Sequence, residues 1–173
     1  MEKYVPDIYQ ESVFTINYDQ LLERGIKCLL FDLDNTLVKV REKIPSEKVK
    51  KLFDELKAKG FKIIIFSNSP KKRVRLFKNA LEVDCCPFAC KPFSRKFLSV
   101  IKVYELKFSE VAIIGDSIMD DIYGGNKVGI TTILIDQLAP KEFFVAGLKR
   151  KREHKVLKKL RDRNLFTKGR YYE

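Results

Sequence analysis

The chain has 173 residues, of which 45% are hydrophobic and 34% are charged, so we expect one folded globular domain and not a disordered chain. It contains no apolar run long enough to span a membrane, and its first residues lack the basic and apolar regions of a signal peptide. The formal net charge is +12, an excess of cations that attracts anionic polymers or anionic membrane surfaces.

The first elements predicted along the chain are an arm and a strand. Residues 1–27 indicate an irregular arm with apolar anchors and a short helix over residues 19–24, which Gly25 ends. Residues 27–33 are nearly all apolar, as expected for a strand that is buried on both faces of a sheet.

Helices and strands then alternate along the chain. The clearest helix covers residues 46–59, because its apolar residues follow helical spacing, Ser46 lies at its start and Gly60 ends it. Further strands are predicted over residues 61–66, 84–89, 111–114 and 131–135, and further helices over residues 71–81, 94–106 and 120–126. The alternation predicts a three-layer, Rossmann-like α/β fold. Its sheet is expected to be mostly parallel, with about five strands and with helices on both faces.

Two carboxylates follow the first predicted strand. The period of two along a strand places Asp32 and Asp34 on the same side, at the carboxyl end, before Asn35 and Thr36 turn the chain. Two carboxylates held close together are unfavourable unless a cation lies between them. The pattern therefore suggests a metal-dependent site with an acidic nucleophile or base, whereas the alternative is a solvated loop that happens to contain two aspartates.

Polar groups also follow three other predicted strands: Ser67 and Asn68, then Lys91, then Asp116 with Asp120 and Asp121. Ligands of open α/β sheets bind outside the carboxyl ends of the strands, so we expect these groups along one edge. Each has a structural alternative. Ser67 could cap the next helix, Lys91 could be a surface lysine, and Asp120 is more readily explained as a solvated or capping residue.

This ordered set of motifs resembles the haloacid dehalogenase (HAD) superfamily of aspartate-nucleophile phosphatases. The matching pieces are Phe31–Leu37, the strand closed by Ser67-Asn68, the isolated Lys91, and Gly115–Asp121. The resemblance implies that Asp32 attacks phosphorus and becomes an aspartyl phosphate. It also implies that Asp34 protonates the leaving oxygen and later accepts a proton from water.

The same resemblance implies the cofactor and the phosphate-binding groups. Mg²⁺ would bind Asp32, Asp116, Asp121 and the backbone carbonyl of Asp34. Asp120 is an alternative to Asp121. We favour Asp121 because it directly precedes residues 122–126, as in relatives with a GDxxxxD pattern, which Gly115, Asp116 and Asp121 match. Substrate phosphate would be bound by Ser67, by Asn68 with the amides at the following helix start, and by Lys91, which is also a catalytic charge-balancing residue.

The segments 35–45 and 70–90 are too short to hold a cap domain, and the second already contains a helix and a strand. Capless members of the superfamily tend to act on proteins, nucleic acids or lipid headgroups. The pieces Tyr4–Tyr9, Leu22–Lys27 and Asp32–Leu37 narrow the resemblance to the YqeG-like subgroup of subclass IIIA bacterial phosphatases, over residues 4–150. That subgroup is similar to phosphatases that produce phosphatidylglycerol from phosphatidylglycerophosphate in phospholipid biosynthesis.

The C-terminal segment is strongly basic, with nine Lys or Arg residues against two acidic residues from Lys149 to Arg163. We therefore divide the chain into a phosphatase domain at 1–148, with its arm at 1–26, and a basic extension at 149–173. We expect the C-terminal segment to dock on the domain through apolar side chains that precede the extension, namely Phe143, Phe144, Val145 and Leu148. We expect a cytoplasmic protein that the basic run could attach to the inner membrane face, although residues 149–163 could instead bind nucleic acid or be a solvated helix.

Four cysteines, at positions 28, 85, 86 and 90, are expected to be reduced thiols in a chain that is not secreted. Cys85, Cys86 and Cys90 could form a zinc loop, but the only histidine, His154, lies far away, so apolar packing is favoured.

Three functions remain open from the sequence. The first is a Mg²⁺-dependent phosphatase acting on phosphatidylglycerophosphate at a membrane. The second is the same chemistry on a nucleic-acid end or a small phosphometabolite. The third is a module that binds RNA or ribosomes while its phosphatase site is idle. Nothing in the sequence indicates the oligomeric state.

Overall fold

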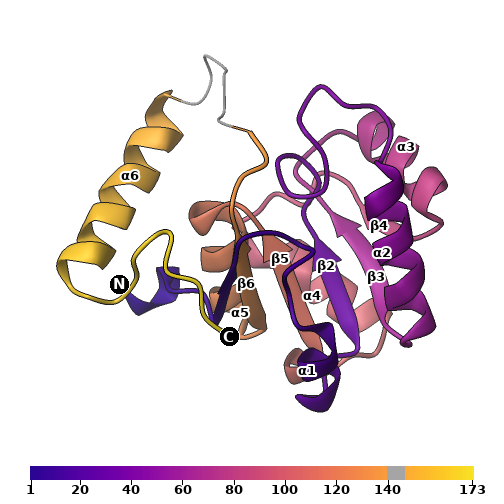
Figure 1. Cartoon of the computed structure of the whole chain (residues 1–173), viewed down its shortest axis with the longest axis horizontal. Coiled ribbons are helices and arrows are strands. Elements are labelled where there is room, and N and C mark those ends of the chain that lie inside the picture. Colours follow the sequence, from indigo (N-terminus) through magenta and orange to yellow (C-terminus); the bar gives the residue numbers. More distant parts are fainter. Residues whose placement is uncertain (140–146) are drawn as a thin grey trace.

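A computed structural model describes residues 1–139 and 147–173, with side chains described for 1–139 and 151–173. Its centre is a six-stranded sheet in which all neighbouring strands are parallel (Figure 1). The strand order is β1 (Ile8–Gln10), β6 (Thr131–Ile135), β5 (Val111–Gly115), β2 (Cys28–Phe31), β3 (Lys62–Phe66) and β4 (Asp84–Cys86). Since β2 lies between β5 and β3, the residues that follow it reach the middle of the carboxyl edge.

The sheet has one strand more than predicted. The sixth is β1, within the arm that the sequence indicated to be irregular, and it pairs with β6 through Ile8 and Ile133. It is only three residues long, so alternation over several residues could not reveal it. Tyr9 in its middle is nonetheless fully buried.

Helices cover both faces, as predicted. They are α1 (Tyr18–Glu23), α2 (Glu47–Ala58), α3 (Lys71–Leu81), α4 (Ser94–Val103), α5 (Tyr123–Val128) and α6 (Gly147–Asp162), with short turns of 3-10 helix at η1 (Glu2–Tyr4) and η2 (Phe108–Glu110). The expected helix over residues 120–126 is divided into a π-helical turn, η3 (Ile118–Ile122), followed by α5. The Ser46 side chain caps α2 by accepting from the Val49 amide at 3.2 Å.

Alternate side chains of the central strands enter two separate apolar cores. On one face Phe31 of β2 packs against Phe53 of α2, with ring centroids 5.0 Å apart. On the other face Phe66 of β3 packs against Phe97 of α4 at 4.5 Å. Burial on both faces explains why these strands are apolar throughout and why only their ends carry polar groups.

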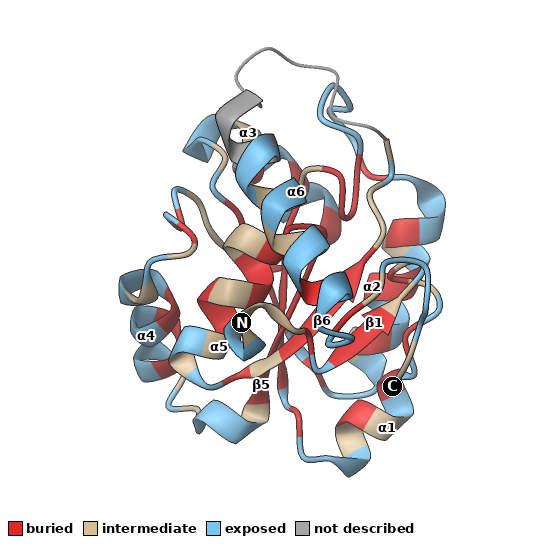
Figure 2. Ribbon diagram, turned by 90° about the vertical axis from the view of Figure 1, so that its left-hand side faces the viewer, coloured by how far each residue is buried: buried red, intermediate tan, exposed pale blue. Residues whose placement is uncertain are grey.

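The C-terminal segment lies against the N-terminal arm, at the β6 side of the sheet and far from α2 and α3 (Figure 1). Leu160 and Phe166 are buried with Tyr9, and Tyr172 forms an antiparallel bridge with Tyr9. The outward residues of α6 are exposed (Figure 2). The domain division at residue 148 stays a prediction, and the side chains expected to dock the segment, those of Phe143, Phe144, Val145 and Leu148, are not among the described side chains.

Candidate active site

Three buried carboxylates meet at the carboxyl edge of the sheet. Asp32 follows β2, Asp116 follows the neighbouring β5, and Asp121 lies in η3. Each offers an oxygen within 4.8 Å of an oxygen of the other two. The Asp32 amide still donates to the Ile114 carbonyl at 2.9 Å, so the pairing of β2 with β5 holds the first two aspartates side by side. Asp120 is not part of this group.

Lys91 supplies a buried cation at the same point. Its Nζ lies 2.7 Å from Asp32 Oδ1 and 2.5 Å from Asp121 Oδ1. Burial by itself would lower the pKa of Lys91, but the carboxylates of Asp121 and Asp32 outweigh it and raise the pKa above its ordinary value. The lysine therefore remains charged.

The negative charges still exceed the positive charge of Lys91. Burial raises the pKa of Asp121 well above its usual range, and the nearby Asp32 and Asp116 add to the effect, although Lys91 acts against it. Three carboxylates against one ammonium group suit a divalent cation that accepts oxygen ligands. The acidic group can thus hold a metal ion.

Asn68 positions the backbone of Lys91. Its Nδ2 donates to the Lys91 carbonyl at 3.1 Å, and its Oδ1 accepts from the Lys91 amide at 2.7 Å. Ser67 is buried beside it, and its Oγ accepts from the Ser69 amide at 3.1 Å. The structure therefore brings Ser67, Asn68 and Lys91 to the edge where the acidic group lies, as expected from the strand ends.

Asp34 lies apart from the three clustered carboxylates. Its Oδ1 accepts from Arg73 Nε at 2.9 Å and from Arg73 Nη2 at 2.6 Å, and its Oδ2 accepts from Ser69 Oγ at 2.5 Å. The predicted strand to residue 33 is too long, because β2 ends at Phe31. The Leu33 carbonyl instead accepts from the amides of a tight turn over residues 36–38, so strand alternation does not orient Asp34.

Sequence reasoning missed the contacts that three polar residues make in the site. The Thr36 hydroxyl lies 3.3 Å from Asp32 Oδ2 and 3.4 Å from Asp116 Oδ1. The other two residues are Ser69 and Arg73, which both contact Asp34. Thr36 could have been found from its place beside the paired aspartates. Arg73 carries no such signal, because it is one of several cations in a basic helix.

Gly115 leaves the space that Asp121 occupies. A Cβ atom at this position would lie 2.2 Å from both Cγ and Oδ2 of Asp121. No side-chain rotation of residue 115 could avoid this, since Cβ is fixed by the backbone. A glycine before Asp116 is therefore required for the three carboxylates to meet.

Comparison with known proteins places the chain in a family. A model of the haloacid dehalogenase-like hydrolases matches residues 40–129. The Bacillus subtilis protein named "Probable phosphatase YqeG" is 33% identical over 158 residues, which cover 91% of this chain and 92% of that protein. The chain belongs to the HAD-like hydrolases. It is a HAD-type phosphatase of the YqeG-like group, as the sequence motifs predicted.

Solved structures share the HAD fold. An uncharacterized protein from Listeria monocytogenes is 16% identical with a TM-score of 0.55, covering 71% of this chain and 88% of that one. The cobalt-bound deoxy-D-mannose-octulosonate 8-phosphate phosphatase YrbI from Haemophilus influenzae is 13% identical with a TM-score of 0.52, covering 78% and 89%. In this HAD protein the segment 35–46 is a loop and the segment 70–90 contains α3 and β4, as expected without a cap.

Cys85, Cys86 and Cys90 form no group of potential metal ligands among the residues that the structure describes. Cys85 and Cys86 are neighbours in β4 and pack against opposite apolar cores, because successive side chains of a strand alternate. Within the described part of the chain, the acidic group of Asp32, Asp116 and Asp121 is the one cluster of potential metal ligands. Packing, which was favoured over zinc, accounts for Cys85 and Cys86 but not for Cys90, which is exposed.

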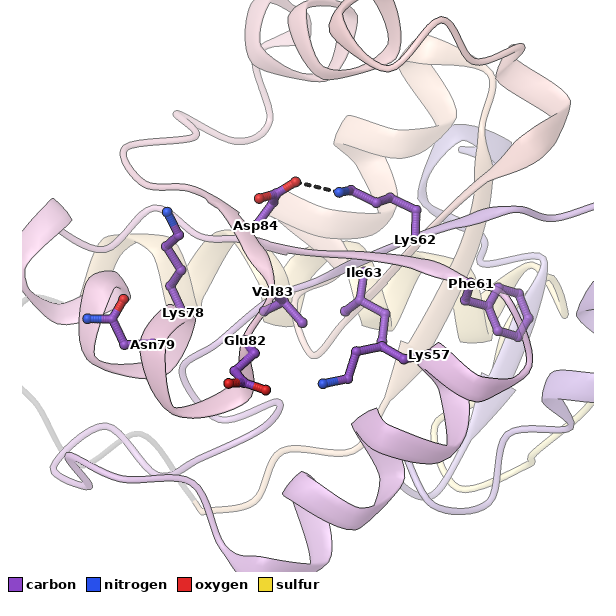
Figure 3. Close-up of a pocket in the computed structure, with 9 residues that line it drawn as sticks. All are labelled: Lys57, Phe61, Lys62, Ile63, Lys78, Asn79, Glu82, Val83 and Asp84. Carbon is purple, nitrogen blue, oxygen red and sulfur yellow. Dashed lines mark ion pairs between the residues drawn. The ribbon is translucent and has the colours of Figure 1, made fainter.

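A pocket of about 520 Å³ lies away from the HAD site (Figure 3). It is at the opposite edge of the sheet, where β3 and β4 begin, and Lys62 and Asp84 on its wall form an ion pair at 2.5 Å. Its other lining residues are Lys57, Phe61, Ile63, Lys78, Asn79, Glu82 and Val83. It contains none of the predicted site residues.

Proposed function

We propose that this HAD phosphatase is a Mg²⁺-dependent phosphomonoester hydrolase that acts on phosphatidylglycerophosphate through an aspartyl-phosphate intermediate. The observation that carries the chemistry is the convergence of Lys91 with Asp32, Asp116 and Asp121 at one edge of the sheet. A buried lysine beside an excess of carboxylates supports a site for a phosphoryl group and a divalent cation.

In the first step an oxygen of Asp32 attacks phosphorus, and the bond from phosphorus to the substrate oxygen breaks. The Lys91 ammonium group contacts the nucleophile Asp32, and from there it can neutralise charge on the phosphoryl oxygens. Ser67 and the amides that begin α3 bind those oxygens. Asn68 contributes by holding the Lys91 backbone.

Asp34 transfers the protons. Its carboxyl group gives a proton to the leaving alcohol oxygen in the first step. In the second step it takes a proton from the water that attacks the aspartyl phosphate, which releases inorganic phosphate and restores the Asp32 carboxylate. Both Arg73 nitrogens donate to Asp34 Oδ1, so the transferred proton would be carried by Oδ2. Ser69 Oγ, which donates to the ionised Oδ2, would then turn its own proton away.

Mg²⁺ would be held by the side chains of Asp32, Asp116 and Asp121 and by the carbonyl of Asp34. When bound, it would neutralise charge that accumulates on the phosphoryl group. The donor set of oxygen atoms fits this hard cation.

The lipid substrate is supported by two features. The segments that could hold a cap are short, and the net charge is +12. An uncovered site can accept a headgroup that remains in a bilayer, and a basic protein is attracted to anionic lipid. No helix in the described ranges is long and apolar enough to cross that bilayer.

Phosphate release from phosphatidylglycerophosphate in mixed micelles tests the proposal. We expect Mg²⁺-dependent release by the wild type and a loss of about a thousandfold or more in Asp32→Asn. Undiminished release by Asp32→Asn would contradict the mechanism. Faster turnover of a 3′-phosphorylated oligonucleotide or a sugar phosphate would retain the chemistry and overturn the lipid substrate.

A further inference from the structure

Large apolar side chains are exposed on the loops around the acidic group. They are Val40 and Ile44 between β2 and α2, Phe88 and Phe93 between β4 and α4, and Leu138 after β6. Ile44 is 75% exposed and Phe93 is 68% exposed, so neither contributes much to the core. Exposed apolar residues that gather in one region mark a surface for binding a protein or a membrane.

Hydrogen bonds connect these loops to the active site. The Phe88 amide donates to the Ser69 carbonyl at 3.1 Å, and Ser69 in turn donates to Asp34. The Leu138 amide donates to the Asn35 carbonyl at 3.1 Å. The loops that carry Phe88 and Leu138 therefore border the active site at the carboxyl edge of the sheet.

The long loop after β2 is tied to the site by Arg73. Its Nη1 donates to the Glu42 carbonyl at 2.8 Å, while its Nε and Nη2 hold Asp34. Val40 and Ile44 lie on either side of Glu42 in this loop. Their exposed side chains are thus anchored within reach of the proposed proton donor.

Cations accompany the apolar side chains. Residues 39–46 contain exposed Lys39, Arg41 and Lys43 against one acidic residue, Glu42. Exposed Lys71 and Lys72 begin α3, and exposed Arg95 and Lys96 follow Phe93. A surface that combines aliphatic and aromatic side chains with cations is complementary to an anionic lipid bilayer, which offers apolar tails below anionic headgroups.

The basic α6 cannot supply the apolar part of such a contact. Its stripe of Val156, Leu157 and Leu160 is turned inward and packs with Tyr9 and Ile118. The outer face of α6 is exposed (Figure 2), and most of the exposed residues described in this helix are Lys or Arg. Glu153 Oε1 accepts from the Ile118 amide at 3.3 Å, which places α6 beside the loop that follows Asp116. The helix can therefore add positive charge near the site but no inserting side chain.

We propose that a docking rim, formed by residues 39–46, residues 88–93 and Leu138, binds an anionic lipid bilayer and turns the active site toward the headgroups. The inference rests on the proposed lipid phosphatase activity and adds the surface through which the protein reaches that substrate. Ile44 and Phe93 insert at the boundary between headgroups and acyl chains, and the neighbouring lysines and arginines pair with lipid phosphates. The exposed aliphatic side chains favour this partner over nucleic acid, which uses aromatic stacking and charge.

A pair of substitutions with a matched control tests the docking rim. Ile44→Glu combined with Phe93→Glu removes both inserting side chains and adds two negative charges. The control combines Val103→Glu with Phe108→Glu, because both residues are exposed and lie at the opposite edge of the sheet, at the end of α4 and in η2. Thermal unfolding identifies any pair that has lost its fold, and single substitutions at the same positions then replace that pair.

Flotation with lipid vesicles measures the binding. We expect the wild type and the control pair to bind vesicles of phosphatidylcholine with phosphatidylglycerol. The rim pair should bind them at least about tenfold more weakly. Equal binding by the rim pair and the wild type would overturn the proposal, as would a wild type that binds single-stranded RNA but no anionic vesicles. Rim-dependent binding without phosphatidylglycerophosphate hydrolysis would retain the docking surface and overturn the proposed function instead.

Discussion

Arg73 holds Asp34 through two nitrogen atoms that converge on a single carboxylate oxygen, at 2.9 Å from Nε and 2.6 Å from Nη2. The same guanidinium group donates to the carbonyl of Glu42 in the long loop after β2. One side chain of α3 therefore links the proposed proton donor to the loop that borders it. A fixed carboxylate is useful for proton transfer, because the distance to the leaving oxygen must be short in the transition state.

We expect Arg73→Ala to lower kcat for an alkyl phosphate by about tenfold to a hundredfold, through loss of this orientation. The loss should be smaller for p-nitrophenyl phosphate, because nitrophenolate leaves without a proton. Steady-state kinetics with both esters measures the difference, and Arg75→Ala, an exposed neighbour on α3, is the control. Equal losses for the two esters would assign Arg73 a role other than positioning Asp34.

Mg²⁺ should raise the thermal stability of the protein, since an ion that binds only the folded state stabilises it by mass action. We expect Asp121→Asn to remove most of the shift in unfolding temperature, because Asp121 belongs to the acidic group. Asp120→Asn should retain it, since the neighbouring Asp120 lies outside that group. Thermal unfolding across a Mg²⁺ titration compares the three proteins, and a shift lost in Asp120→Asn alone would reverse the assignment.

Gly115→Ala should disrupt the acidic group with little effect on the sheet. The new methyl group would overlap the Asp121 carboxyl group, which must move away from Lys91. We expect a Mg²⁺ affinity at least about tenfold weaker, measured by calorimetry, while far-ultraviolet circular dichroism remains that of the wild type. Gly60→Ala is a useful contrast, because no atom lies within 4 Å of its added Cβ, so any cost there comes from its positive φ alone.

The strand ends could be predicted because the residue types change abruptly there from apolar to polar, although both kinds are buried. Ile114 and Asp116 are two residues apart, and one lies in the core while the other lies in the acidic group. Parallel strands then bring such ends together whatever the loops between them do. This is why Asp32, Ser67, Lys91 and Asp116 were foreseen at one edge.

Contacts that depend on long, flexible side chains, or on short strands at the edge of the sheet, could not be predicted in the same way. Arg73 is one of several cations in α3, and only the fold shows which of them reaches Asp34. The strand β1 has three residues, so its pairing with β6 comes from tertiary contacts and not from a repeating pattern. The packing of Leu160 and Phe166 on Tyr9 likewise joins segments from the two ends of the chain.

The thiols should differ strongly in reactivity. Burial raises the pKa of Cys28 to about 12, so at pH 8 it remains a protonated thiol that no reagent reaches, whereas Cys90 is exposed. We expect an aromatic disulfide reagent to modify Cys90 rapidly in the folded protein and all four cysteines after denaturation. The fast phase should be absent from Cys90→Ser. Rapid labelling of Cys28 in the native state would mean that the sheet opens far more readily than its burial implies.

The C-terminal segment should contribute to the stability of the whole fold and not behave as an independent tail. Phe166 is buried against Tyr9, so we expect Phe166→Ala to lower the free energy of unfolding by about 3 kcal/mol. Leu165→Ala, which shortens a neighbouring side chain that is 39% exposed, should cost under about 1 kcal/mol. Urea unfolding followed by circular dichroism measures both. Since Tyr9, Phe166 and Ile118 belong to one apolar cluster, and Ile118 begins the turn that holds Asp121, loosening this cluster should also weaken Mg²⁺ binding. If Phe166→Ala left both quantities unchanged, the segment after residue 148 would be an extension with a separate role, as its charge alone suggested.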